Sequence, residues 1–254
     1  MDQHTVVLHV ALAVAGISAG FLNTMAGGGS MLTLPILMLL GLPADLANGT
    51  NRISVVGQSI SGVHAFRRAG RLEGTAIASV VVPTVLGSAA GAAAAAHVPP
   101  ELLKYVLLGT MMVMAVVMLL FPTVVSATAD EAPLLRERRI AAFMGLFGAG
   151  LYGGFVQAGV GFVLLSVLGG VIRYDVVRAN ALKLVCTGIF GLVALAVFTW
   201  AGQVVWWLGG LLAAYTVIGS QLGVRFAVRV RHGVIRWIIT GAVVATCVGA
   251  LLKG

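Results

Sequence analysis

The sequence contains little charge, and acidic residues are especially few. Only 9% of its 254 residues are charged and 8 are acidic, whereas 59% are hydrophobic. A soluble globular domain carries about 25% charged residues, so we expect this chain to be integral to a membrane. The basic residues lie in short segments between apolar runs, where Lys and Arg act as orientation signals. The expected partner is therefore a lipid bilayer, and nucleic acid is not expected.

Residues that support catalysis or metal binding are equally scarce. The two cysteines, Cys186 and Cys247, lie within apolar runs, which is typical of small buried side chains. The five histidines are scattered, without metal-ligand spacing or a nucleophile motif. The stretch "AGGGS" at 26–30 has neither a preceding strand nor the Lys-Ser/Thr ending of a phosphate loop. The sequence therefore predicts no enzyme, no cofactor and no metal.

What the sequence does contain is an internal repeat. Residue i aligns with residue i+132 without a gap, so that "AGGGS" at 26–30 matches "AGVGF" at 158–162 and "TVLGSAAG" from Thr84 matches "TVIGSQLG" from Thr216. Each copy has five apolar segments, at 6–23, 30–41, 47–66, 75–96 and 102–121 in the first and from about 140, 162, 179, 204 and 234 in the second. The second segment of each copy is shorter than the roughly 20 residues that a spanning helix needs.

The basic residues indicate that the two copies have opposite orientations. Arg67, Arg68 and Arg71 follow the third segment of the first copy, whereas the corresponding "WAGQ" from Trp200 is neutral. In the second copy the basic residues instead precede the third and fifth segments, namely Arg173, Arg178, Arg225, Arg229 and Arg231. Corresponding loops therefore face opposite sides by the positive-inside rule.

These patterns predict an all-α integral membrane protein with two inverted-topology repeats. We expect about 8 to 10 transmembrane segments, including short or re-entrant helices, an arrangement typical of transporters. The predicted domains are an N-terminal transmembrane repeat (1–125), a basic cytoplasmic linker (126–138) and a C-terminal inverted repeat (139–254).

The glycines between the first two segments predict a turn inside the membrane. Such a turn is tolerated where it lines a cavity, and consecutive glycines allow left-handed torsions there. The short helix that follows would be capped by Ser30 and would direct its N–H groups toward an anion. The second copy has the corresponding turn at 158–162. The tips of the two glycine-rich turns are expected to meet near the midplane of the membrane. Gly87, Gly91, Gly219 and Gly223 are interpreted as helix-packing positions instead.

Two basic residues, Arg52 and Lys183, lie inside the third segments of the two copies. A charge facing lipid costs about 2.5 to 3.5 kcal/mol, so such residues usually face a cavity or a partner, although both are near enough to a segment start to snorkel to the interface. All acidic residues map to ends or loops, so no buried carboxylate is expected beside them. An anion from outside the chain would then neutralise them.

Residues 20–72 resemble a known family. The Gly-rich turn at 27–29, the "LPADLANGTN" stretch at 42–51 and the "RRAGR" loop at 67–71 are similar to the N-terminal signature of the sulfite exporter TauE/SafE family, and the likeness continues through the second repeat. The resemblance implies a multi-pass permease of the bacterial cell inner membrane that exports sulfite or small sulfonates.

The expected function is export of a small sulfur-containing anion, such as sulfite or sulfoacetate, by alternating access between the repeats. The alternative is a carrier or channel for another small anion such as a carboxylate; a scaffold is disfavoured because it needs no cation inside the membrane. A homodimer is compatible with the glycine-lined surfaces. The candidate substrate-binding residues are Gly27, Gly28, Gly29, Ser30, Gly49, Thr50, Asn51, Arg52, Gln157, Gly159, Gly161 and Lys183.

Overall fold

The described part of the chain is helical. The computed structural model describes residues 3–25, 27–72, 77–120, 134 and 137–227. The first half contains α1 (Gln3–Met25), α2 (Ser30–Leu39), α3 (Ala44–Arg68), α4 (Ile77–Ala96) and α5 (Pro100–Leu120). The second contains α6 (Arg139–Phe155), α7 (Val160–Leu165), the π-helix η2 (Ser166–Val171), α8 (Val176–Trp200) and α9 (Trp206–Ala227). The predicted all-α class is confirmed, whereas most of the predicted linker at 126–138 and the segment from 234 lie outside the described residues.

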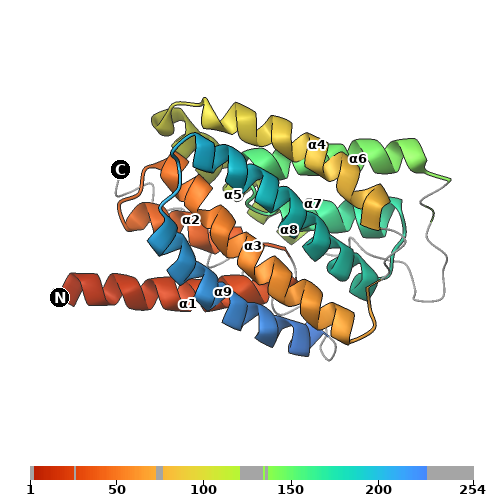
Figure 1. Ribbon diagram of the computed structural model, residues 1–254, viewed down its shortest axis with the longest axis horizontal. Coiled ribbons are helices and arrows are strands. Elements are labelled where there is room, and N and C mark those ends of the chain that lie inside the picture. The colour runs from red at the N-terminus through yellow and green to blue at the C-terminus, as the bar shows by residue number, and fades with distance from the viewer. Residues whose placement is uncertain (1–2, 26, 73–76, 121–133, 135–136, 228–254) are drawn as a thin grey trace.

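The two halves present their helices in the same order. The central helices α3 and α8 each have 25 residues, and their bounds differ by the repeat offset at both ends. The packing is reciprocal, because α1 packs against α9 whereas α6 packs against α4. In Figure 1, α1 begins at the left edge and α6 at the right, and both end near the middle of the molecule. This arrangement is compatible with the predicted inverted repeats.

Four of the described helices are long and apolar enough to cross a membrane, and they cover Ile77–Ala96, Pro100–Val117, Val176–Trp200 and Trp206–Arg225. The second segment of each copy forms a shorter apolar helix, as the sequence predicts. Helix α3 is as long as α8 but less apolar, because it buries polar side chains such as Asn48, Arg52 and Gln58 against other helices. These features define a multi-pass membrane protein.

The glycines at 87, 91, 219 and 223 allow close contact between helices. A Cβ added at any of them would lie within 2.9 Å of backbone in the facing helix, which is α6 for the first pair and α1 for the second. The packing interpretation of these four residues is confirmed. Since the two pairs are related by the repeat, they join the halves in equivalent ways.

Arginines and tryptophans mark opposite ends of the bundle. The end of α3 packs with the start of α8 and with Val224 near the end of α9. Arg68, Arg138 and Arg173 are exposed at this end of the bundle. At the other end, the turn between α8 and α9 carries exposed tryptophans, and Trp200 is 94% exposed. Interfacial tryptophan and a one-sided excess of arginine are both typical of membrane proteins. By the positive-inside rule, we expect the arginine end to face the cytoplasm.

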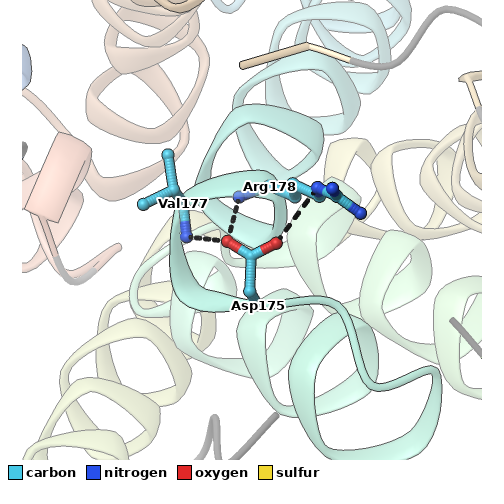
Figure 2. A network of polar contacts seen from close by, with 3 residues as sticks. All are labelled: Asp175, Val177 and Arg178. Carbon is cyan, nitrogen blue, oxygen red and sulfur yellow. Dashed lines mark hydrogen bonds and ion pairs between the residues drawn. The ribbon is translucent and has the colours of Figure 1, made fainter. Parts of the chain in front are cut away.

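Helix α8 starts at a well-defined cap. Asp175 accepts hydrogen bonds from the backbone N–H groups of Val177 (3.0 Å) and Arg178 (3.2 Å), and its other oxygen pairs with Arg178 Nε at 3.2 Å (Figure 2). An aspartate at this position satisfies N–H groups that have no partner within the helix. The cap therefore sets the start of the helix that carries Lys183.

Candidate functional site

The glycine-rich turns of the two halves touch each other. Gly27 follows α1 with φ +83°, and Gly159 precedes α7 with φ +74°, so both need the left-handed torsions that glycine allows. A Cβ added at Gly27 would lie 2.4 Å from the Cα of Gly161, and one at Gly161 would lie 2.3 Å from the Cα of Gly27. The two backbones can approach this closely only because neither residue has a side chain.

The predicted capping role of Ser30 is wrong. The N-cap position of α2 is Gly29, with φ −57° and ψ −41°, and no side chain makes a capping hydrogen bond there. Ser30 is already the first helical residue, whereas a cap acts from the non-helical residue before the helix. Gly29 occupies the cap position because a Cβ there would lie 2.3 Å from the carbonyl oxygen of Ala19 in α1.

Arg52 binds the C-terminal end of α6. Its side chain is fully buried, which excludes snorkelling to the interface. Nη1 donates to the carbonyl oxygen of Gly153, and Nη2 donates to those of Gly154 (2.9 Å) and Phe155 (3.4 Å). Nη2 also donates to Oδ1 of Asn48, one turn earlier in α3, at 3.0 Å. A side chain of the first half therefore satisfies helix-end carbonyls of the second half.

Lys183 makes the reciprocal contact with the C-terminal end of α1. This side chain is also fully buried. Its Nζ donates to the carbonyl oxygens of Asn23 (2.8 Å) and Thr24 (3.3 Å) and to Oδ1 of Asn180 at 2.7 Å. The end of a helix carries about half a negative charge, which attracts a cation. In each half, therefore, the helix before the glycine-rich turn (α1 or α6) ends at a cation that the other half supplies, so that the turn breaks the helix beside a buried charge.

Several buried polar atoms beside the tips have no hydrogen-bond partner among the described residues. They include Nδ2 of Asn51, Nε of Arg52 and both amide atoms of Gln157. The oxygen of Asn51 accepts a hydrogen bond from Thr33 Oγ1 at 2.7 Å, which holds α3 against the first turn of α2. Gln157 has φ +66°, an uncommon torsion outside glycine. A buried polar atom without a partner costs about 1 to 3 kcal/mol, so these are the atoms that a ligand would satisfy.

Gly49 and Thr50 contact a different part of the molecule. A Cβ at Gly49 would lie 2.0 Å from the carbonyl oxygen of Gln203, and the hydroxyl of Thr50 accepts a hydrogen bond from Val205 N at 2.9 Å. These contacts hold the turn between α8 and α9. The structure thus brings Gly27, Gly161, Arg52 and Lys183 to the helix ends and the tips, but it places Gly49 and Thr50 against this turn.

The candidate substrate-binding residues predicted from the sequence do not include two positioning residues, Asn48 and Asn180. Each accepts a hydrogen bond from the buried cation of its own helix, and Asn48 Nδ2 also donates to the carbonyl oxygen of Phe155 at 2.8 Å. The repeat alignment places them at equivalent positions, "AN" at 47–48 and at 179–180. This match between the repeats is the sequence feature from which the shared role of the two asparagines could have been predicted. The helix-end carbonyls that they help to bind left no signal in the sequence.

Two broken helices that meet end to end, each with a buried cation at its end, define the architecture of a membrane transporter. A family model confirms this class, because the model for "Sulfite exporter TauE/SafE" matches residues 12–250. The chain belongs to the sulfite exporter TauE/SafE family.

Curated relatives agree with the class of protein. The chain is 26% identical over 220 residues to a probable membrane transporter protein of Haemophilus influenzae, covering 84% of this chain and 83% of the relative. It is 29% identical to the probable membrane transporter protein ORF9 of Sinorhizobium (85% and 82% covered) and 26% identical to the probable membrane transporter protein YfcA of Escherichia coli K12 (86% and 80%). No solved structure gives a significant match.

Proposed function

We propose that this transporter exports a small sulfur-containing anion, such as sulfite or an organosulfonate like sulfoacetate, by alternating access between its two repeats. The observation that carries the proposal is the pair of fully buried cations, Arg52 and Lys183, which form no ion pair with any described acidic residue. Their hydrogen-bond partners are neutral oxygens of helix ends and amides.

The charges at the two helix ends do not cancel. Each cation brings one positive charge, whereas each helix end offers about half a negative charge. The two cations and the two helix ends together therefore leave about one positive charge uncompensated in a buried region. A monovalent anion bound beside the tips would neutralise this excess, and burial would strengthen the attraction.

The donors without partners suit an oxyanion. Asn51 Nδ2, Gln157 Nε2 and Arg52 Nε are buried N–H groups that lack an acceptor among the described residues. A sulfite or sulfonate group presents three oxygens that can accept hydrogen bonds from these donors, whereas a carboxylate presents two. The family description favours the sulfur anion. A carboxylate carrier or channel remains the alternative.

The way in which the two halves are joined supports the proposal of alternating access. The contact between the tips and the two cation contacts all connect one half to the other. Rocking one half against the other would open the region beside the tips first to one side of the membrane and then to the other.

The first test measures anion-dependent thermal stability of the purified protein in detergent. We expect sulfite or sulfoacetate to raise the unfolding midpoint of the parent more than acetate or chloride at equal ionic strength. A larger response to acetate would favour the carboxylate alternative. A flat response to every anion would contradict the proposal. Uptake into proteoliposomes then separates a carrier from a channel, whose conductance would far exceed carrier turnover.

Substitution of Gln157 separates binding from folding. Because its amide has no partner within the described structure, Gln157→Ala should leave the midpoint in anion-free buffer unchanged or slightly higher. It should weaken anion binding by about 10- to 100-fold, the loss expected for one hydrogen bond to a charged group. The measurement is the anion concentration that gives half of the maximal rise in the midpoint.

Gln221 provides the matched control for this substitution. Its amide nitrogen donates to the hydroxyl and the carbonyl of Ser61, so Gln221→Ala should lower the midpoint without changing the anion affinity. If Gln157→Ala instead behaves like Gln221→Ala, the amide of Gln157 serves the fold and does not bind the anion.

A further inference from the structure

We infer that the ammonium group of Lys183 occupies a monovalent-cation site built at the C-terminal end of α1. Three oxygens surround it, the carbonyl oxygens of Asn23 (2.8 Å) and Thr24 (3.3 Å) and the amide oxygen of Asn180 (2.7 Å). This inference goes beyond the proposed function, because it concerns a bound cation and requires no transported anion.

The chemistry of the ligands is that of a site for a dissolved monovalent cation. All three partners are neutral oxygens, and two of them belong to the last turn of a helix, where the backbone dipoles concentrate negative potential. In transporters with broken helices, such carbonyls at half-helix ends coordinate Na⁺. Here the chain supplies the cation itself, on a side chain that is fully buried.

A tethered cation has consequences that a dissolved one lacks. Lys183 lies in α8, whereas Asn23 and Thr24 lie in α1, so a cation that is covalently attached to the second half binds the first half through hydrogen bonds and electrostatic attraction. It cannot dissociate during a transport cycle, so the parent protein needs no free cation at this position. Removal of the side chain should leave an empty site that a small free cation can fill.

The matching contact at Arg52 is built differently. The guanidinium of Arg52 divides its contacts between two nitrogens: Nη1 donates to the carbonyl of Gly153, and Nη2 donates to the carbonyls of Gly154 and Phe155 and to Oδ1 of Asn48. The ammonium of Lys183 brings all of its three acceptors to one atom. All contacts of the Lys183 side chain converge on Nζ, as they would on a single spherical ion, whereas those of Arg52 are shared between two nitrogens. The cation site is therefore assigned to α1 and not to α6.

The experiment is a cation titration of Lys183→Ala in detergent. The variant is purified in choline chloride, and choline is replaced stepwise by ammonium, potassium or sodium at constant chloride and ionic strength. We expect ammonium, the ion closest in chemistry to the lost group, to raise the unfolding midpoint saturably by roughly 2 °C or more. The parent, whose site is filled by Lys183, should show no such rise.

Two further variants make the result specific to the site. Adding Asn180→Ala to Lys183→Ala removes one of the three oxygens, so half-saturation should shift to a cation concentration about tenfold higher or more. Lys183→Met also lacks the charge but fills the space with an apolar chain, so it should not respond to ammonium.

The proposal is overturned if Lys183→Ala responds to ammonium no more than the parent or Lys183→Met does. It is also overturned if Lys183→Ala stays unfolded in all four cations, because a free cation should then refill the site. Since chloride is constant and no sulfur anion is present, these outcomes are independent of those that test the exported anion.

Discussion

Single glycines decide whether the two tips can meet. Gly27 combines a left-handed torsion with backbone contact to Gly161, so a side chain at Gly27 would meet both a torsional and a steric penalty. Gly41 has a similar torsion, φ +94°, but a Cβ added there would have no atom within 4 Å apart from its chain neighbours. The two positions separate the cost of the torsion from the cost of the contact.

We expect Gly27→Ala to destabilise the protein more than Gly41→Ala does. Both substitutions carry a torsional cost of about 1 to 3 kcal/mol, but only Gly27→Ala adds an overpacking cost of about 1 to 3 kcal/mol. The unfolding midpoint in detergent should therefore fall further in Gly27→Ala, by several degrees. Equal midpoints in the two variants would mean that the contact between the tips contributes little.

Gly161→Ala tests the same contact from the other half. No left-handed torsion is involved at Gly161, yet its added Cβ would lie 2.3 Å from the Cα of Gly27. Any loss of stability in this variant therefore reports the contact alone.

Helix ends carry the contacts that organise the site. Helix α8 begins at the cap made by Asp175 and, two turns later, places Lys183 at the end of α1. Helix α3 places Arg52 at the end of α6 in the equivalent way. Each central helix thus contributes its own cation and orients it with an asparagine of the same helix.

We expect Asp175→Ala to lower the free energy of unfolding by about 1 kcal/mol, because two backbone N–H groups lose their acceptor. For a chain of this size the midpoint should fall by roughly 2 to 4 °C. Arg178→Ala is the control, since it keeps the cap and removes the partly exposed ion pair with Asp175, which is worth about 0.5 kcal/mol. A fall in Arg178→Ala as large as in Asp175→Ala would assign the effect to the ion pair.

The whole molecule presents an arginine end and a tryptophan end. Arg68 at the end of α3 and Trp200 at the end of α8 lie on opposite sides of the bundle, as expected if corresponding segments of the two halves have opposite directions. The positive-inside rule places Arg68 in the cytoplasm and Trp200 outside.

This orientation can be measured by cysteine labelling in cells. In a background with Cys186→Ala and Cys247→Ala, Trp200→Cys should react with an impermeant maleimide added to intact cells, because residue 200 is 94% exposed. Gly70→Cys, in the turn after α3, should react only after the membrane is opened. Labelling of both positions from the same side would contradict the inverted orientation of the two repeats.

Much of the architecture could be predicted because it depends on local signals. Gly27, Gly159 and Gly161 mark the two turns, and the regular offset between the halves predicts that both halves have the same order of helices. The prediction failed where a role depends on one residue of register. Ser30 was expected to cap α2, but it is the first residue of the helix, and the cap position is held by Gly29, where a side chain would collide with α1.

By itself the sequence determined that the protein belongs in a membrane, that it consists of two copies of one unit, and that each copy contains a basic residue within its third segment. Only the tertiary structure decided what these cations contact. Their partners are backbone carbonyls at the ends of α1 and α6, brought from the other half of the chain. Every residue has a carbonyl group, so residue types do not distinguish the few that lie at a helix end beside a cation.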